Sequence, residues 1–277
     1  MITAILIPLY NPGIKHFLLI KSVLSSVTNI NKKFVVYIAN DGPESKVILP
    51  MNFIDQIFEF CFKNTIEIKL FSFIDKNGYP KIYQELTKIV LKNKSIDEIH
   101  FIDQDDYCLP NRFLYGNKKY LMYSDTYVVD NKFKILKKLL NNKKYPVCLM
   151  ETPAPGMTYS VPRRFLEEYI FYCESYQLIS TLAHDYVISQ IAFSKGEIAS
   201  LKQVTMLYIQ HQTNTYGYKI GVKFYFSKIN NFKKILTRLK INFYFLNIIY
   251  KNKKLINCNR MHQNILINYI YKFLRFK

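Results

Sequence analysis

The chain has 277 residues, of which 49% are hydrophobic, so it can bury a substantial core and does not have the composition of a disordered protein. Its formal net charge of +19 favours an anionic partner, such as nucleic acid, a phosphate-bearing substrate or a membrane surface. The five cysteines form no CxxC pair, which argues against a zinc knuckle or a disulfide framework and favours a reducing compartment.

Neither a secretory signal nor a membrane-spanning helix is expected. The apolar run at the N-terminus has no basic residues before it. The longest apolar candidate, residues 241–250, falls short of the roughly 20 residues that span a bilayer, and it contains two asparagines. We therefore expect a cytoplasmic protein, with peripheral binding at the inner face of the plasma membrane as a second location.

The first hundred residues predict strands alternating with helices. The predicted strands are residues 4–9, 34–39, 66–73 and 98–102, and the predicted helices are residues 15–27, 54–62 and 82–91. This alternation is typical of an α/β fold with a mainly parallel sheet flanked by helices. In such sheets the ligand lies beyond the carboxyl ends of the strands, where this chain has its polar clusters.

The second half predicts a less regular order. We expect helices at 111–121, 133–140, 162–172 and 178–193, a strand at 125–129, a constrained loop at 152–156 and an extended segment at 198–210. From residue 219 onward the chain holds eleven Lys and three Arg but no acidic residue, with aromatic residues interleaved. The predicted domains are therefore 1–217 and a basic, aromatic, helical region at 218–277.

Three carboxylates, Asp103, Asp105 and Asp106, directly follow the fourth predicted strand. Crowded carboxylates raise each other's pKa unless a cation compensates, and a hard divalent ion prefers such oxygen ligands. Strand alternation would let Asp103 and Asp105 converge while Gln104 faces away. The alternative is a solvated acidic turn in which Asp106 caps a helix that starts near Pro110.

Three further clusters each allow a structural and a functional interpretation. The Asn40-Asp41-Gly42 segment is either a plain turn or a binding segment whose Asp41 carboxylate accepts hydrogen bonds from a base or ribose. The His184-Asp185 pair fits a helix N-terminus better than a general base. His211, in a dense polar run, fits an exposed loop better than a metal ligand.

Taken together, these motifs resemble the family 2 glycosyltransferases with the GT-A fold, in particular the bacterial rhamnosyltransferase-like branch that builds O-antigens and capsules. The matching segments lie in the family's order across roughly residues 2–217: residues 7–12, 40–42, 77–78, 101–111, 123–125, the Gly156 loop, 184–185 and 208–214. The chain departs from the family's usual residues at Asn40, Pro43, Tyr186 and Ile209, where Asp, Ser, Trp and Arg are common.

The resemblance implies a role for each matched residue. Asp185 would be the catalytic base, and Asp105, Asp103 and His211 would lie at a Mn²⁺ or Mg²⁺ ion, with Asp105 the direct ligand and Asp106 mostly structural. Pro8, Tyr10 and Asp41 would line the base pocket, and Asn77 would lie near the nucleotide. The full set expected around the nucleotide-sugar is Pro8, Tyr10, Asn11, Asn40, Asp41, Asn77, Gly78, Asp103, Gln104, Gly156 and His184.

The activity implied is that of an inverting, metal-dependent hexosyl- or deoxyhexosyltransferase. Its donor would be a UDP- or dTDP-sugar, and its acceptor a saccharide, often lipid-linked, in the synthesis of O-antigen, capsule or lipooligosaccharide. The basic region at 218–277 would be either a solvated helical face or a platform on anionic lipid.

Two other functions remain as alternatives. A nucleic-acid-binding protein fits the charge but leaves the acidic cluster unexplained, and the chain carries no known reader motif. A GT-A-fold scaffold without catalysis is the other, although Asp103, Asp105, Asp185 and His211 are all present.

Overall fold

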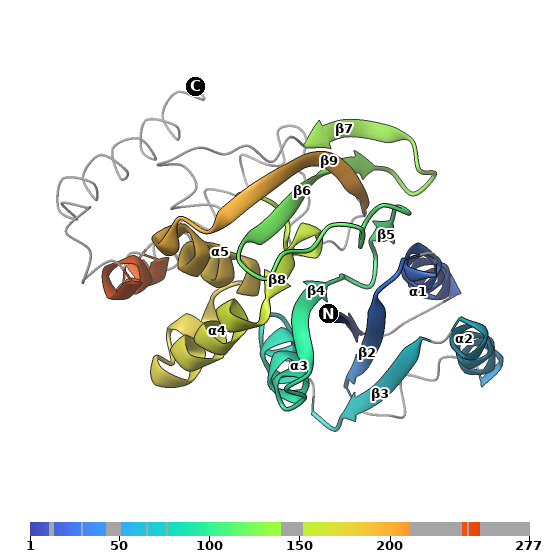
Figure 1. Cartoon of the computed structure of the whole chain (residues 1–277), viewed down its shortest axis with the longest axis horizontal. Coiled ribbons are helices and arrows are strands. Elements are labelled where there is room, and N and C mark those ends of the chain that lie inside the picture. The colour runs from blue at the N-terminus through green and yellow to red at the C-terminus, as the bar shows by residue number, and fades with distance from the viewer. Residues whose placement is uncertain are drawn as a thin grey trace, which may run out of the picture.

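The computed structural model describes residues 1–10, 14–28, 30–42, 51–64, 66–75, 77–139, 152–210, 240–242 and 244–249. Within these residues the chain forms a nine-stranded sheet with helices on both faces (Figure 1). The α/β class predicted from the sequence is confirmed.

The first half of the chain contains every element that its pattern predicts. The elements are β1 (Ile2–Leu9), α1 (Ile14–Val27), β2 (Lys33–Asp41), α2 (Met51–Lys63), β3 (Glu67–Phe73), α3 (Lys81–Leu91) and β4 (Ile96–Phe101). The strands lie in the order β3-β2-β1-β4, and all three pairings are parallel. The carboxyl ends of these four strands therefore lie along one edge of the sheet.

The second half extends the sheet beyond β4 with mixed pairings. Its elements are β5 (Tyr107–Cys108), β6 (Leu121–Val129), β7 (Ile135–Leu139), the 3-10 turn η3 (Gly156–Thr158), β8 (Ser160–Pro162), α4 (Arg163–Ser175), the 3-10 turn η4 (Ile179–Thr181), α5 (His184–Lys195) and β9 (Ile198–Ile209). The order continues as β4-β8-β6-β9-β5, with β7 paired to β6. Strands β8 and β7 run antiparallel to their neighbours, whereas β6 and β9 are parallel.

Two helices predicted in this half are wrong. Residues 110–114 form turns instead of a helix, and a Cβ at Gly116 would overlap the buried Glu98 carboxylate. The predicted helix at 133–140 is strand β7, because the Asp130 carboxylate accepts hydrogen bonds from the Lys132 and Lys134 amides, both 2.9 Å, and turns the chain back onto β6. The predicted helix at 178–193 is interrupted between η4 and α5.

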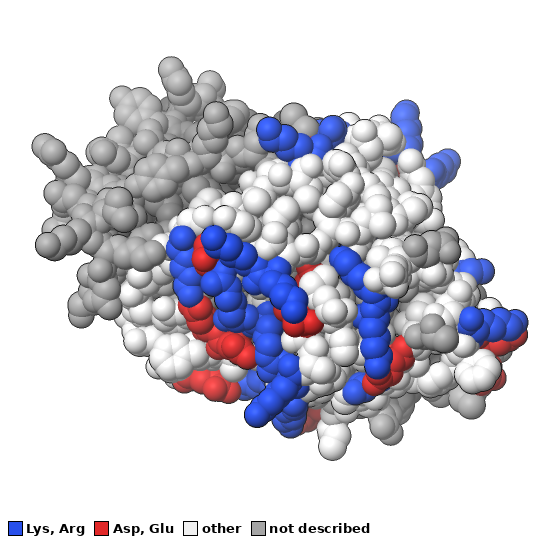
Figure 2. All heavy atoms as spheres, viewed as in Figure 1, with Lys and Arg blue, Asp and Glu red and all other residues white. Residues whose placement is uncertain are grey.

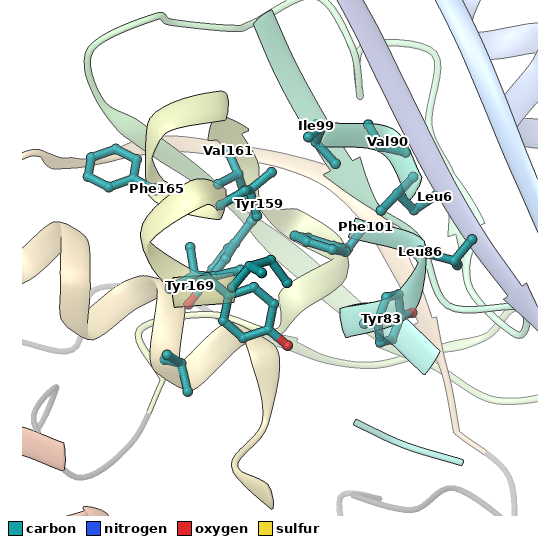
Figure 3. Packing of buried hydrophobic residues seen from close by; sticks show 14 of the residues in the cluster. Leu6, Tyr83, Leu86, Val90, Ile99, Phe101, Tyr159, Val161, Phe165 and Tyr169 are labelled. Atoms are coloured by element: carbon teal, nitrogen blue, oxygen red, sulfur yellow. The ribbon is translucent and has the colours of Figure 1, made fainter. Parts of the chain in front are cut away.

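Each face of the sheet has its own apolar core, as expected for strands buried on both sides. Leu6, Leu86 and Phe101 belong to the core under α3, α4 and α5, which Figure 3 shows from close by. Ile5 and Phe113 belong to the core on the opposite face, where α1 and α2 pack. The cysteines among the described residues, Cys61, Cys108 and Cys173, are free and buried.

Strand β4 turns two titratable side chains, Glu98 and His100, away from the apolar core that holds Phe101. The fully buried Glu98 carboxylate accepts hydrogen bonds from the Thr3 hydroxyl, 3.2 Å away, and from the Ser160 hydroxyl. His100 Nε2 lies 3.6 Å from Glu98 Oε2. Burial alone would raise the pKa of Glu98, but the nearby His100 imidazole and the hydrogen bond from Ser160 lower it to about 2, so the carboxylate is ionised.

The described part of the C-terminal region packs on this body. Residues 240–242 and 244–249 are helical, and Phe245 is buried with its ring 5.5 Å from that of Tyr172. The predicted boundary between residues 217 and 218 lies outside the described residues. Among the described residues, no helix combines the length and the apolar character needed to cross a bilayer.

Candidate functional site

The carboxyl ends of β1 and β4 are joined by a side-chain tether. Gln104 Oε1 accepts a hydrogen bond of 2.7 Å from the Tyr10 amide, which directly follows β1. Strand β4 ends at Phe101, and the Asp106 amide donates to the Asp103 carbonyl at 3.3 Å, so the acidic stretch is a turn. The strand alternation expected for Asp103 and Gln104 is therefore wrong, and Gln104 reaches the neighbouring strand end.

The carboxyl ends of β2 and β3 are joined by Asp41. Its buried carboxylate accepts hydrogen bonds from the Asn77 amide at 2.6 Å and from the Gly78 amide at 2.7 Å. Gly78 has φ +67, a left-handed conformation that favours glycine. Asn40 is also buried, and its side-chain amide donates to the Gly42 carbonyl at 3.2 Å. Both oxygens of Asp41 thus hold the 77–78 loop in place.

Asp103 lies at the centre of the acidic turn. Burial, and then the charges of Asp105 and Asp185, raise its pKa to about 7, although the Tyr83 hydroxyl donates a hydrogen bond to the Asp103 carboxylate. The first turn of α5 lies close to the turn after β4, because the ring of His184 contacts Phe101 at the end of β4 and Tyr83, which donates to Asp103. The structure therefore brings together residues 103–105 and Asp185, which are far apart in sequence.

Asp106 is the most buried side chain of the acidic turn, at 1% exposed. Burial and the charges of Asp103 and Asp105 raise its pKa well above the usual range, and the Ile209 amide offsets this only in part. Neither carboxylate oxygen has a hydrogen-bond partner of normal geometry within the described residues. A buried carboxylate of this kind is stable only with a proton or a cation beside it.

The oxygen atoms of these carboxylates are suitable ligands for a divalent cation, but they do not form a complete coordination shell. Within the described parts of the chain, no group of three or more His, Cys, Asp and Glu side chains is arranged to hold a metal ion. The donors present are all oxygen atoms, which Mg²⁺ and Mn²⁺ prefer, and the oxygens of Asp106 lack partners within the described residues. The turn can therefore supply part of a coordination shell. His211 lies outside the described residues.

His184, the first residue of α5, forms one wall of the site. Its imidazole lies between the rings of Tyr83 and Phe101, with centroid distances of 4.1 and 4.6 Å. Neither ring nitrogen has a hydrogen-bond partner within the described residues, and burial lowers the pKa of His184 to about 3, so the ring is neutral at pH 7. A Cβ at Gly156 would lie 2.7 Å from His184 Nε2, so the loop can pass here only as glycine.

Asp185 lies in the first turn of α5, where the helix dipole favours a carboxylate. Its Oδ1 accepts a hydrogen bond of 2.8 Å from the Tyr186 amide. The helix N-terminus expected for this pair is confirmed, while the role of Asp185 as a base stays a prediction. Of the other expected residues, Pro8 is half-buried in β1, Tyr10 is exposed beyond it, and Asn11 lies outside the described residues.

Three side chains near this site were not among the expected site residues. Tyr83, on α3, looks like an ordinary core aromatic in its helical pattern, yet its hydroxyl reaches Asp103. Tyr208 lies at the end of β9, where burial and then the charges of the acidic turn raise its pKa. The buried Arg112 guanidinium donates to the Met157 carbonyl at 2.8 and 3.1 Å, and so fixes the segment that follows Gly156.

No protein-family model matches this chain, and no curated protein sequence matches it at a significant level. Among solved structures, the crystal structure of S. aureus TarS 1–349 is similar over 92% of this chain and 73% of that chain, with 14% sequence identity and a TM-score of 0.49. A likeness at this level carries no argument about function, so the chemistry of the site rests on the geometry described above.

Proposed function

We propose that this protein is an inverting, metal-dependent glycosyltransferase that moves a sugar from a nucleotide-diphosphate sugar to a saccharide acceptor. The observation that carries the proposal is the place of the acidic turn, at the carboxyl end of β4 and linked to the N-terminus of α5 through Tyr83, which donates to Asp103 and lies against the ring of His184. Such a turn, at the carboxyl edge of parallel strands and facing a helix N-terminus, is suited to a cation and a phosphorylated ligand.

The acidic turn would hold a Mn²⁺ or Mg²⁺ ion through Asp105 and Asp103, and the buried oxygens of Asp106 would add to the negative field. When bound, the ion would supply positive charge that offsets the charge developing on the departing diphosphate. The described residues offer only part of a coordination shell, which leaves positions for phosphate oxygens. His211 would be a further ligand.

Asp185 would act as the general base. The acceptor hydroxyl oxygen would form a bond to the anomeric carbon while the bond to the diphosphate breaks, and the diphosphate would keep the electron pair. Asp185 would take the proton from the hydroxyl, and the single displacement would invert the anomeric carbon. Its place in the first turn of α5, near Asp103, supports this role.

The remaining site residues would position these groups. Asp41 orders the 77–78 loop where the nucleotide would lie, and Gln104 fixes the end of β1 beside Pro8 and Tyr10. Tyr83 orients Asp103, while the neutral ring of His184 excludes water from that side of the carboxylate. We propose a UDP- or dTDP-hexose or deoxyhexose as donor and a lipid-linked saccharide of a surface polysaccharide as acceptor.

The described surface around α4 gives little support to a nucleic-acid-binding function. On the face in Figure 2, basic and acidic atoms are interleaved around α4, where the ion pairs are Arg163–Glu167, Arg164–Glu197, Lys195–Glu168 and Lys118–Asp97. A duplex or single strand is bound by an uninterrupted basic stripe. The acidic turn would also repel a nucleic-acid backbone.

The test is binding and turnover of UDP-, GDP- and dTDP-sugars with Mn²⁺ or Mg²⁺. We expect one donor class to raise the melting temperature only with metal, and its sugar to be hydrolysed or transferred. Asp105→Ala should abolish the metal-dependent shift, Asp185→Asn should keep it but lose turnover, and Asp55→Ala, at an exposed position on α2, should behave as wild type. No response of the native protein to any donor would refute the function, and a response that survives Asp105→Ala would refute the metal assignment alone.

A further inference from the structure

The hairpin of β6 and β7 projects from the body with an unusual surface. Residues 131–138 are all exposed, and they contain Lys132, Lys134, Lys137 and Lys138 but no acidic residue. Between these lysines, Phe133, Ile135 and Leu136 are 49%, 56% and 46% exposed. We call residues 131–138 the hairpin surface; Lys and Arg atoms project from the edge of the molecule where Figure 1 places β7 (Figure 2).

The turn that presents this surface is tightly built. The Asp130 carboxylate accepts hydrogen bonds from the Lys132 and Lys134 amides, and the Phe133 amide donates to the Asp130 carbonyl at 2.9 Å. Phe133 has φ 61, a left-handed conformation that is unfavourable for an aromatic residue and that glycine or asparagine would adopt readily. The chain thus keeps a half-exposed aromatic side chain at a position that glycine or asparagine would occupy more readily.

The lysines at the tip of the hairpin surface, Lys132 and Lys134, differ from the basic side chains around α4. Around α4 the basic side chains are neutralised by acidic neighbours, as in the Arg163–Glu167 pair. By contrast, Lys132 and Lys134 make no ion pair with any described residue, and Lys138 lies 3.8 Å from Asp125. The tip of the hairpin surface therefore combines two lysines that make no ion pair with a described residue, Lys132 and Lys134, with exposed apolar side chains.

We propose that the hairpin surface docks on an anionic membrane, with its lysines against lipid headgroups and with Phe133, Ile135 and Leu136 in the interfacial layer. This mixture of basic and apolar side chains is the kind that binds an anionic bilayer surface. A single-stranded nucleic acid would use lysine and an aromatic platform, but it gains little from exposed Ile and Leu. The two aliphatic side chains therefore favour lipid as the occupant.

The hairpin surface also lies next to the acidic turn. The Phe133 ring packs edge-to-face against the ring of Tyr107, with centroids 5.6 Å apart, and Tyr107 directly follows Asp106. Docking would thus bring the acidic turn close to the lipid surface. That orientation matters for catalysis only if the proposed function holds, whereas docking itself does not depend on it.

The test is co-sedimentation of the full chain with vesicles of phosphatidylcholine alone or of phosphatidylcholine with phosphatidylglycerol. We expect binding to the anionic vesicles only, and about 30-fold weaker partitioning for the double variant Lys132→Glu/Lys134→Glu. The matched control is Lys92→Glu/Lys94→Glu, which has the same spacing and charge change at exposed positions after α3 and should bind like wild type. Phe133→Asn should weaken binding without loss of thermal stability, because asparagine tolerates the left-handed backbone.

Several outcomes would overturn the proposal. These are equal binding to neutral vesicles, no binding to either vesicle, or equal losses in the two charge-reversal variants, which would show that only net charge matters. Binding to an oligonucleotide that is lost in Lys132→Glu/Lys134→Glu, without vesicle binding, would assign the hairpin surface to nucleic acid instead. Because the readout is lipid binding, its failure is distinct from failure of the nucleotide-sugar assays.

Discussion

The phenol ring of Tyr83 lies against the imidazole of His184, with centroids 4.1 Å apart, while its hydroxyl donates to the Asp103 carboxylate. This one side chain on α3 therefore contacts both the turn after β4 and the start of α5. The acidic turn and the N-terminus of α5 come from distant parts of the sequence, and Tyr83 fixes their relative position.

Removing only the Tyr83 hydroxyl should impair the proposed activity more than the fold. Tyr83→Phe keeps the ring against His184 but removes the hydrogen bond to Asp103. A hydrogen bond to a charged group contributes about 1.5–3 kcal/mol, so we expect a roughly 10- to 100-fold fall in kcat/KM. Tyr172→Phe on α4 is the matched control and should leave kcat/KM unchanged. An unchanged kcat/KM in Tyr83→Phe would show that the hydroxyl has no part in the site.

Gly156→Ala should destabilise the protein through one specific clash. The added methyl group would lie 2.7 Å from His184 Nε2, and such overpacking costs about 1–3 kcal/mol. In a double-mutant cycle, Gly156→Ala should cost less in a His184→Ala background, because the clashing ring is gone. The measurement is the free energy of unfolding in urea. Strictly additive losses would mean that the glycine is required for another reason.

Asp41→Asn should loosen the 77–78 loop. An amide side chain can accept only one of the two hydrogen bonds that Asp41 accepts, and its NH₂ group would face the other amide. We expect a cost of about 1–3 kcal/mol and faster hydrogen exchange at the amides of Asn77 and Gly78. Asp55→Asn on α2 is the control with the same chemical change at an exposed position. Unchanged exchange at both amides would contradict the clamp.

The two buried histidines should lower the stability of the protein as the pH drops below about 6.5, whereas the raised pKa values of Asp103 and Asp106 contribute in the opposite direction. Burial and then the charge of Arg112 lower the pKa of His100 from 6.5 to about 4, and burial lowers that of His184 to about 3. Between pH 6.5 and these lowered values the two histidines bind protons in the unfolded chain but not in the folded chain, so their contribution to the free energy of unfolding decreases with falling pH. The lowered pKa of Glu98 continues the loss below pH 4.5, towards about 2.

His100→Asn isolates one part of this pH dependence. The variant should flatten the loss between pH 6.5 and 4 by about 1.4 kcal/mol per pH unit, the contribution of one proton, and should also narrow the Glu98 window, because His100 is the first of the groups that lower the pKa of Glu98. Urea unfolding at several pH values gives the slope directly. A slope equal to that of wild type would show that His100 titrates normally in the folded protein.

The sequence predicts most of the first half of the fold, because apolar strands, helical spacing and turn residues alternate there without conflict. Prediction from the sequence fails where contacts between distant segments determine the local structure. Nothing in the residues after Pro110 indicates that the Arg112 side chain will be buried and will donate to the Met157 carbonyl in η3. The Lys-rich segment at 133–140 has a composition typical of a helix, but the two hydrogen bonds that Asp130 accepts turn the chain into a hairpin. Local propensity is a weak guide at such positions.

The candidate site also has parts that the sequence indicates and parts that it does not. The residue types and strand-end positions of Asp41 and Asp103 are visible in the sequence, because parallel strands bring their carboxyl ends together. Their partners are not visible: the tether from Gln104 to Tyr10 spans 94 residues, and Tyr83 reaches Asp103 from a helix whose pattern indicates only a core position. Side-chain orientation across such separations depends on packing, which a single sequence does not encode locally.

The tether between Tyr10 and Gln104 has a consequence for how the protein folds. It closes a loop of 94 residues, whereas Asp41 and Asn77 are only 36 apart, a difference of about 1 kcal/mol in closure entropy. We expect the 77–78 loop to be ordered early, and the acidic turn to gain its neighbours only after β4 has formed and α5 has docked. During synthesis, the two ends of the site would therefore meet only after residue 185 has left the ribosome, so a nascent chain that stops short of α5 would have the strands from β3 to β6 but neither β9 nor a working centre.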